Sequence, residues 1–374
     1  MRILYYFPEL YTQMFTWQRI HIFDELQAHG VQVDAFNPLI YNSYDEANEA
    51  LIQTASSNNY DMFLASICSE KMLYYQTLDK LKSMGLPTVS FRPDNLTIPF
   101  NDKNLAPKFD LLWLTSKETQ HLYDKWHVKT LFLPYAANPF AFKYTQVPLI
   151  RKACFNGTPY GSRSLMINKL ADSGIPVDVY CKSNPCMTKN DEGTKAQTKL
   201  KVLLQSPRET LINDLKYHEG RKILLGALLN KVSRPTSLTE KDSLKLLPFV
   251  SFNDLSANYS KYTLCLSSTS NRNTDVLRNP VKIINLRAFE IPMSGGITLC
   301  KYNPELAEYF EDGKEIIFYH DNQELVEKAR YYIENASDEE ILQIKQAARY
   351  RAENEHTWWN RFSMLFKELG LKYE

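Results

Sequence analysis

The sequence has no long hydrophobic run and no excess of charge of either sign. Its longest apolar stretch, ILLGALL at 223–229, is far shorter than the roughly 20 residues that cross a membrane. Lys and Arg together number 44 against 43 for Asp and Glu, which gives a formal net charge of +1. Such a balance offers no broad basic surface of the kind that nucleic-acid-binding proteins use. Membrane-spanning and nucleic-acid-binding functions are therefore not expected.

Cysteine is scarce and is not spaced for zinc. The six cysteines lie mostly in apolar, strand-like runs, as Cys154 and Cys265 do. Cys181 and Cys186 are the closest pair, but no histidine stands near them. The start, MRILYYFPEL, has no cleavage-site pattern and predicts a first strand rather than a signal peptide. Buried free thiols and a cytoplasmic protein are the expectation.

Short apolar runs alternate with amphipathic segments over the first 140 residues. A helix around Trp17 to Gly30 follows the first run, and Ser43 with Glu46 forms a capping-box pattern that opens the next helix. Parallel strands need a crossover between them, so this alternation predicts a Rossmann-like domain. The predicted strands are 2–7, 31–36, 61–65, 87–91, 110–114 and 130–133.

The same alternation restarts after LPYAANPF at 133–140, whose two prolines interrupt the rhythm and mark a domain boundary. The predicted architecture is α/β, with Rossmann-like domains at 1–140 and 141–355 whose parallel sheets face each other across a cleft. A last helix within 356–374, with Trp358 and Trp359, is expected to cross back to the first domain. Ligands of open parallel sheets bind beyond the carboxyl ends of the strands, so we expect the active site in the cleft.

A polar, Lys-rich stretch at 182–247 does not follow the alternation and is interpreted as an insertion in the second domain. It contains KYHEGRKILLGALLNK at 216–231, which has two possible roles. One is a helix packed on the domain, which we favour because apolar and basic residues alternate without a clean face. The other is a peripheral contact with the inner face of a membrane.

The segment NLRAFEIPMSGGITL at 285–299 is the most informative for chemistry. It predicts a short helix that begins near Asn285 and is closed by Gly295, with Arg287 and Glu290 three residues apart on one face. A carboxylate so placed can accept two hydrogen bonds from a ribose diol. The alternative is a surface ion pair on an ordinary helix.

Several segments together resemble a known family. They are VSFNDLSANYSKYTLCLSS (250–268), NLRAFEIPMSGGITL (285–299), NPELAEYFEDGKEIIFYHDNQELVEKARYYI (303–333) and a final helix with His356 and Arg361. Upstream, ACFNGTPYGSRSLMINKLADSGIPVDVY (153–180) fits the same pattern, while SFRPDNL and LPYAANPF match more loosely. This order resembles the group 1 glycosyltransferases, in the subset related to the spore maturation protein CgeB.

The resemblance implies a GT-B glycosyltransferase whose second domain binds a nucleotide-sugar donor. Glu290 falls on the second of two family glutamates, the one that binds the donor ribose, whereas Lys282 stands where the first would be. The resemblance therefore implies the ribose contact, and it implies neither the sugar contacts of the wider group nor inversion or retention at the sugar. The non-catalytic alternative is a nucleotide-sugar- or glycan-binding protein of a cell surface or spore coat, and a nucleotide-sugar epimerase is a third possibility.

The donor diphosphate needs positive potential, because its charge grows in the transition state. Gly157 and Gly161 bracket a loop through which backbone N–H groups can approach a phosphate, and Arg163 opens the following helix. Further cations stand before or within the Glu290 helix, at Arg272, Arg278, Lys282 and Arg287. The predicted donor-binding residues are Gly157, Arg163, Lys282, Asn285, Arg287, Glu290 and Gly295.

No D-x-D triplet occurs, so the sequence offers no such carboxylate pair for Mg²⁺ or Mn²⁺, and we expect a metal-independent reaction without a cofactor. The first domain is expected to bind the acceptor. Asp94 follows a predicted strand and is the candidate base for the acceptor hydroxyl, or else an Asx turn after Pro93. Tyr11 and Phe15 are candidate cleft residues, and His21 is expected to be structural.

Overall fold

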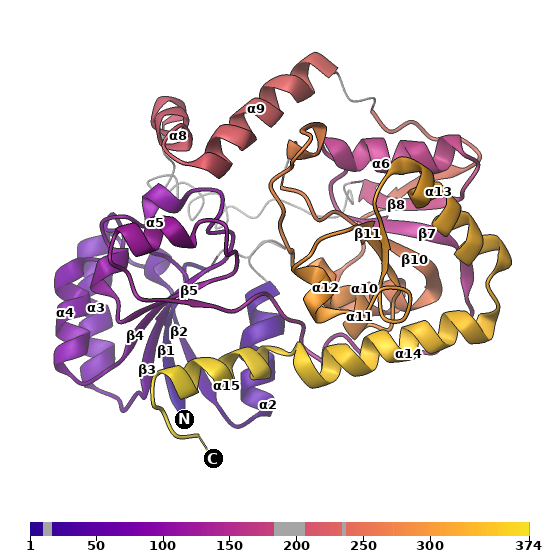
Figure 1. The fold of residues 1–374 in the computed structure, drawn as a ribbon. Helices are drawn as coiled ribbons and strands as arrows, with labels where there is room; N and C mark the ends of the chain where they lie inside the picture. The colour runs from indigo at the N-terminus through magenta and orange to yellow at the C-terminus, as the bar shows by residue number, and fades with distance from the viewer. Residues whose placement is uncertain (10–16, 183–205, 234–236, 272, 374) are drawn as a thin grey trace. The chain divides into compact units, whose positions relative to one another are not determined.

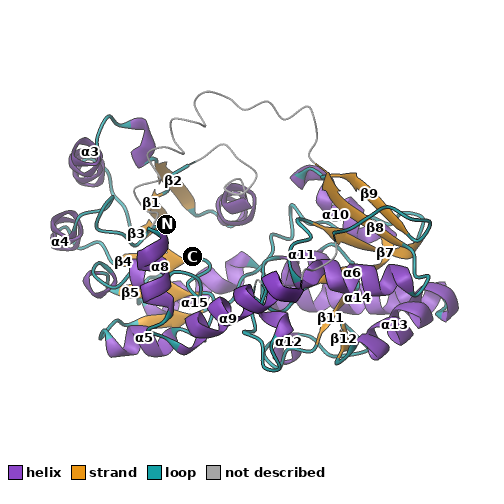
Figure 2. Ribbon diagram, turned by 90° about the horizontal axis from the view of Figure 1, so that it is seen from above, coloured by secondary structure: helices purple, strands orange, loops and turns teal. Residues whose placement is uncertain are grey.

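The computed structural model describes residues 1–9, 17–182, 206–233, 237–271 and 273–373, which form two compact units. Of the described residues, the first unit contains 1–134, 206–220 and 358–373, and the second contains 135–182, 221–233, 237–271 and 273–357. Figure 1 follows the chain through both units, and Figure 2 separates their helices from their strands. Residues 206–220 lie in the first unit, whereas the sequence places them in an insertion of the second domain.

The first unit is built on a six-stranded parallel sheet in the order β2-β1-β3-β4-β5-β6. Its strands begin and end within two residues of the predicted runs. They are β1 (Arg2–Tyr6), β2 (Gln32–Phe36), β3 (Met62–Ala65), β4 (Thr88–Arg92), β5 (Leu111–Leu114) and β6 (Thr130–Phe132).

The first unit also contains six α-helices among its described residues. They are α2 (Asp24–Ala28), preceded by a π-helical turn at Arg19–Phe23, α3 (Tyr44–Ser56), α4 (Tyr75–Ser83), α5 (Gln120–Lys125), α8 (Pro207–Asp214) and α15 (Trp358–Glu368). Short 3₁₀ turns occupy Pro38–Ile40, Pro99–Asn101 and Ala106–Lys108. At the start of α3 the backbone N–H of Glu46 donates to Ser43 Oγ at 3.1 Å, the capping contact that the sequence predicts.

The last helix, α15, lies in the first unit. The Glu25 side chain, 0% exposed, accepts hydrogen bonds from the backbone N–H groups of Trp359 (2.8 Å) and Trp358 (3.3 Å). Trp358 and Trp359 begin α15, and a carboxylate at the amino-terminal end of a helix satisfies N–H groups that have no partner within the helix. The Trp358 ring packs 5.9 Å from Phe91 and 6.0 Å from Trp113, so strands β4 and β5 hold the returning segment.

The second unit repeats the plan, with six parallel strands in the order β12-β11-β10-β7-β8-β9. They are β7 (Ile150–Asn156), β8 (Val177–Lys182), β9 (Leu244–Pro248), β10 (Tyr262–Ser267), β11 (Thr298–Lys301) and β12 (Ile317–Tyr319). Sequence reasoning did not assign β9. This edge strand is only partly buried, so its apolar pattern is weak.

The helices of the second unit include the segment predicted to carry the donor-binding residues. They are α6 (Ser162–Asp172), α9 (His218–Ser233), α10 (Phe252–Lys261), α11 (Arg287–Met293), α12 (Leu306–Tyr309), α13 (Asn322–Arg330) and α14 (Asp338–Glu355). The first residues of α9, 218–220, belong to the first unit. A π-helical turn at Tyr331–Asn335 continues α13. The predicted α/β fold with two parallel, Rossmann-like sheets is confirmed.

Both cores follow from the period of two along buried strands. In the first unit Leu112 and Leu114 belong to the cluster that includes residues of α3 and α4, while Trp113 between them packs against Phe362 of α15 at 5.1 Å. The described cysteines Cys68, Cys154, Cys181, Cys265 and Cys300 are free thiols, as the sequence predicts. Cys186 lies outside the described residues.

Candidate functional site

The loop between β7 and α6 brings main-chain groups to the carboxyl end of the second sheet. Strand β7 ends at Asn156, and Gly157 follows with φ +133°, a conformation that side-chain-bearing residues rarely adopt. Gly161, with φ +60°, precedes the first residue of α6. The two glycines therefore allow the turn that places the start of α6 beside the end of β7, where ligands of parallel sheets bind.

Arg287 reaches this loop from α11, 130 residues further along the chain. Its guanidinium lies so close to Gly157 that a Cβ atom on that glycine would stand 2.7 Å from Nη2. The Arg287 Cζ atom also lies 5.2 Å from the centre of the Phe155 ring, in a cation–π contact. The absence of a side chain at Gly157 thus makes room for the guanidinium, and two predicted donor-binding residues come together.

Arg163 is the second cation of this group. Its Nη1 donates to the Thr158 carbonyl at 3.2 Å, and its Cζ stands 4.3 Å from the Tyr160 ring centre. Burial lowers the pKa of Arg163, and the positive charge of Arg287 lowers it further, while Tyr160 and Asp275 raise it. The two positive guanidinium groups therefore repel each other. An anion bound beside them would relieve that repulsion.

Glu290 lies on α11 three residues after Arg287, as the sequence predicts, but its side chain is covered. The residue is only 5% exposed. Burial has the largest effect on the pKa of Tyr259 and raises it. The charge of Arg287 lowers this pKa and the charge of Glu290 raises it, so both side chains lie near the Tyr259 ring. A ribose must therefore reach a carboxylate that is covered by other residues. A phosphate would meet Arg287 at the Gly157 loop.

Asn285 ties the start of α11 to the end of β10. Its Nδ2 donates to the Ser268 carbonyl at 2.8 Å. Its Oδ1 is buried and accepts no hydrogen bond from the described residues. Since buried polar atoms are nearly always satisfied, this oxygen is available to a donor other than the described residues.

Lys282 and Gly295 do not join the group around Gly157. Lys282 lines a neighbouring pocket with Lys301 and Tyr302. Gly295 follows the carboxyl-terminal end of α11 with φ +68°, and a Cβ there would stand 2.3 Å from the Tyr144 ring. The role of Gly295 in the structure is conformational, because it ends the helix and admits an aromatic ring.

In the first unit, Asp94 follows β4 on an exposed turn. It has φ +56°, and its carbonyl accepts hydrogen bonds from the N–H (3.0 Å) and Oγ1 (2.9 Å) of Thr97. The next residue, Asn95, is fully buried and binds Thr115 and Ser116 on the loop after β5. Asp94 thus lies at the carboxyl end of the sheet on a turn anchored by its neighbour.

Sequence reasoning missed a buried ion pair at the same end of this sheet. Arg92, the last residue of β4, donates from Nε to Asp102 Oδ2 at 2.9 Å, and the Tyr123 hydroxyl donates to the same oxygen at 2.7 Å. Burial lowers the pKa of Arg92, but Asp102, Cys68 and Tyr123 together raise it by more, so the guanidinium is charged. Lys301 was missed in the same way. Both are basic residues that end a buried apolar strand, a signal that the sequence shows.

Of four further candidates, the structure describes one. Tyr11, Phe15 and Arg272 lie outside the described residues. His21 is fully buried between aromatic side chains, 6.3 Å from the ring centres of both Trp17 and Trp358, which fits the structural role expected of it. No helix within the described residues is long and apolar enough to cross a membrane.

Comparison with known proteins gives one partial match in sequence and several in fold. Residues 208–367 match a family of sequences described as glycosyl transferase-like. No curated protein matches the sequence.

Solved structures of low sequence identity have the same fold over nearly the whole chain. HepE (Alr3699) from Anabaena, in complex with UDP-glucose, is 13% identical with a TM-score of 0.55, and 99% of each chain is covered. Sucrose-phosphate synthase (tll1590) from Thermosynechococcus elongatus is 11% identical, with a TM-score of 0.54 and 98% of each chain covered. Trehalose 6-phosphate synthase from Burkholderia multivorans is 10% identical, with a TM-score of 0.54 over 99% of this chain and 98% of that one.

The chain therefore has the GT-B fold that the resemblance predicts, and its residues 208–367 are glycosyltransferase-like in sequence.

Proposed function

We propose that the protein is a glycosyltransferase that moves a sugar from a nucleotide-diphosphate donor to a hydroxyl of a glycan, glycolipid or protein. The observation that carries this proposal is the convergence of Gly157, Arg163 and Arg287 at the carboxyl ends of the second sheet. The Arg287 side chain forms neither a hydrogen bond nor an ion pair with the described residues. The likeness to HepE in complex with UDP-glucose supports a nucleotide-sugar donor.

In this proposal the two arginines hold the donor diphosphate. Negative charge grows on the leaving diphosphate as the bond to the sugar breaks, so fixed positive groups stabilise the transition state more than the ground state. Arg163, Arg287 and the N–H groups at the start of α6 supply that charge, and we propose that no metal ion is required. The finer relation to the CgeB-related subset stays a prediction.

We propose that Glu290 accepts hydrogen bonds from the donor ribose, and a thermal-shift screen tests this. A nucleotide at 100 times its dissociation constant stabilises the native protein by about 2.7 kcal/mol. We expect one of UDP, GDP, CDP, ADP and dTDP, or its sugar, to stabilise the wild-type protein. Loss of hydrogen bonds to a charged group costs about 1.5–3 kcal/mol, so Glu290→Gln should bind that nucleotide roughly 10–100 times more weakly.

The matched control for this substitution is Glu334→Gln. Glu334 is a surface carboxylate of the same unit, paired with Arg330 at 3.4 Å. The Glu334→Gln variant should bind the nucleotide as the wild type does. Equal nucleotide affinity in the Glu290 and Glu334 variants would remove the ribose assignment, and a screen in which no nucleotide stabilises the wild type would remove the donor site altogether.

We propose that the first unit binds the acceptor and that Asp94 takes the proton of its hydroxyl. General bases of this kind contribute about 10²–10⁴ to turnover. Asp94→Asn should therefore lower kcat by about that factor while leaving nucleotide affinity unchanged. A kcat within threefold of the wild-type value would show that the exposed Asp94 turn is only structural.

The membrane contact, which the sequence offered as the alternative role of 216–231, gains one observation from the structure. Leu225, Leu228, Leu229 and Val232 are exposed at i, i+3, i+4 and i+7 of α9, so one face of the helix is apolar. Sequence reasoning overlooked this face. We propose that this apolar face of α9 lies on the inner surface of a membrane. The double variant Leu228→Glu, Val232→Glu should then no longer co-sediment with anionic lipid vesicles. Unchanged co-sedimentation would contradict the contact.

Two other functions fit the same fold and give different results in one assay. An epimerase would convert the bound nucleotide sugar without any acceptor. A non-catalytic binding protein, which Lys282 in place of the first family glutamate favours, would bind the nucleotide sugar without converting it. Release of the nucleoside diphosphate, by transfer or by slow hydrolysis, is the result that the proposed transferase predicts.

A further inference from the structure

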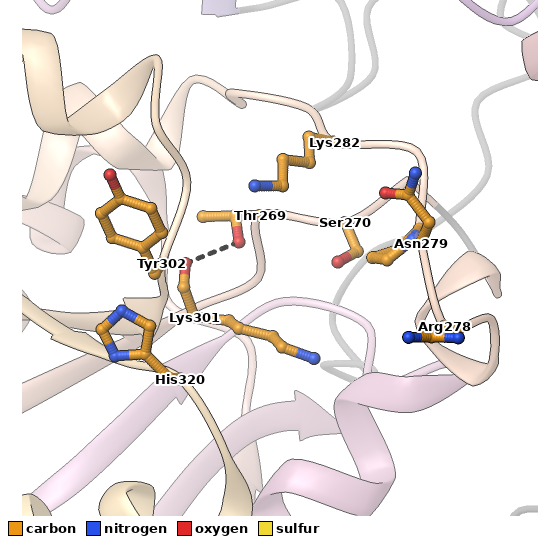
Figure 3. A pocket seen from close by; sticks show the side chains of 9 residues that line it. Thr269, Ser270, Arg278, Asn279, Lys282, Lys301, Tyr302 and His320 are labelled. Carbon is orange, nitrogen blue, oxygen red and sulfur yellow. Dashed lines mark hydrogen bonds between the residues drawn. The ribbon is translucent and has the colours of Figure 1, made fainter.

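We call Gly157, Arg163 and Arg287 the arginine group. A second pocket opens beside it, at the carboxyl ends of β10, β11 and β12 (Figure 3). Its volume is about 240 Å³. The residues that line it come from the loop after β10, from the end of β11 and from the residue after β12. They are Thr269, Ser270, Arg278, Asn279, Pro280, Lys282, Lys301, Tyr302 and His320, which we call the lysine pocket.

Backbone hydrogen bonds fix the walls of the lysine pocket. The Asn271 N–H donates to the Val281 carbonyl at 2.8 Å, and the Ile283 N–H donates to the Thr269 carbonyl at 2.9 Å. The loop after β10 therefore folds back on itself and sets Lys282 opposite Ser270. Thr269 Oγ1 donates to the Lys301 carbonyl at 2.9 Å, which ties this loop to the end of β11.

The lysine pocket carries positive charge without a counterion. Arg278, Lys282 and Lys301 line it, no Asp or Glu does, and none of the three cations forms an ion pair within the described part of the chain. Burial lowers the pKa of Lys282, and the charge of Lys301 lowers it further, so these two amines lie close enough to repel each other. His320 is the remaining basic residue, and its Nδ1 stands 2.9 Å from Glu324 Oε2.

An aromatic wall faces these cations. The Tyr302 residue is 39% exposed, and its ring stacks on His320 with a centroid distance of 5.1 Å. Lys282 Nζ lies 5.7 Å from the centre of the same ring. Figure 3 shows Tyr302 and His320 on one side of Lys301 and Arg278 on the other. A flat ring beside amines suits a ligand with an apolar ring face and a negative charge.

The lysine pocket adjoins the proposed diphosphate site. A smaller cavity lined by Arg163, Met166, Asp275 and Tyr319 shares Thr269, Ser270 and Lys301 with the lysine pocket. One ligand bound at Arg163 can therefore extend toward Lys301. Because Arg163 and Arg287 already serve the diphosphate in the proposed function, the cations of the lysine pocket are available for a different anion.

We propose that the lysine pocket binds a carboxylate or phosphate carried on a sugar ring, so that the substrate of this enzyme includes an acidic sugar. The inference rests on the proposed function in that the diphosphate occupies the arginine group. The acidic sugar is either the one carried by the donor or a separate phosphorylated sugar. Both sources present the same anion to Lys282 and Lys301.

Calorimetric titration of the whole protein tests this with four probes: UDP-glucuronate, UDP-glucose, glucuronate and glucose 6-phosphate. If the charge is on the donor sugar, wild-type protein should bind UDP-glucuronate at least tenfold more tightly than UDP-glucose. If it is on a separate sugar, glucose 6-phosphate should bind on its own. In Lys301→Met and Lys282→Met the preference should fall to about one or the binding should be lost, whereas Lys301→Arg, which keeps the charge, should retain it.

The outcomes separate this inference from the proposed function. Binding of the charged sugars without any binding of UDP-sugars, or of other nucleotides in the screen, would support the lysine pocket and remove the donor site. Binding of nucleotides with no advantage for a charged sugar, and none for glucose 6-phosphate, would overturn the inference and leave the donor site in place. An advantage that persists in both methionine variants would also overturn it, since the charge would then be read elsewhere.

Discussion

Replacing Arg287 with alanine should weaken nucleoside diphosphate binding by about 10–100-fold and lower donor turnover by about 10²–10³-fold. The loss of affinity corresponds to the contribution of a hydrogen bond to a charged group, which is about 1.5–3 kcal/mol. The loss of turnover is the usual effect of removing one preorganised donor from a site where negative charge develops. Arg287→Lys should recover only part of either loss, because an ammonium cannot bind two phosphate oxygens in the planar geometry of a guanidinium.

The same substitution should leave the unliganded protein as stable as the wild type. Arg287 lowers the pKa of Arg163, so the two charges disfavour each other while no anion is bound. Removing one of them relieves that repulsion, which offsets the loss of the contact with Phe155 and of the attraction to the Tyr259 hydroxyl. Thermal denaturation with and without the nucleotide measures both effects. The control is Arg330→Ala, a surface cation of the same unit paired with Glu334. Affinity and turnover within threefold of the wild-type values would contradict the assignment of Arg287.

Breaking the ion pair between Arg92 and Asp102 should have the largest effect on stability. Asp102 is 0% exposed, and its Oδ2 accepts from both Arg92 and Tyr123. Asp102→Asn would leave the Arg92 guanidinium buried without its counterion. Removing one partner of a buried pair costs about 3–5 kcal/mol, which is a large share of the stability of a typical domain.

A double variant separates the loss of the pair from the loss of packing. Replacing both partners of a buried ion pair by apolar residues is often neutral. Arg92→Met combined with Asp102→Leu should therefore be more stable than either single variant. Denaturant midpoints read from tryptophan fluorescence give the comparison, since Trp113 lies on the neighbouring strand β5. A single variant with a wild-type midpoint would show that this pair contributes little.

The fold was predictable because its signals are local and repeated. Most parallel strands are short apolar runs, and several crossover helices show a start or stop signal, as Ser43 and Gly30 do. Edge strand β9 escaped prediction because only part of it is buried. The helical residues 206–220 were assigned to the wrong unit by continuity of sequence, which carries no information about tertiary contacts.

The candidate site was predictable only in part, for a physical reason. The positions of Gly157, Arg163 and Arg287 relative to their own strands and helices follow from the sequence, but their convergence depends on the order of the strands. Strand β10, which precedes α11, pairs with β7, and this pairing brings segments 130 residues apart to one edge. The lysine pocket was missed because sequence reasoning assigned Lys301 and Tyr302 no role, and their position beside Lys282 depends on the pairing of β10 with β11.

Hydrogen–deuterium exchange with and without a saturating nucleoside diphosphate tests the central claim most directly. The amide protons to follow are those of 157–164, between β7 and the first turn of α6, and of 285–290, at the start of α11. If the arginine group and the start of α6 hold the donor diphosphate, the nucleotide should slow exchange in both segments. A nucleotide that binds and leaves both segments unchanged, or protects only residues of the first unit, would contradict this account.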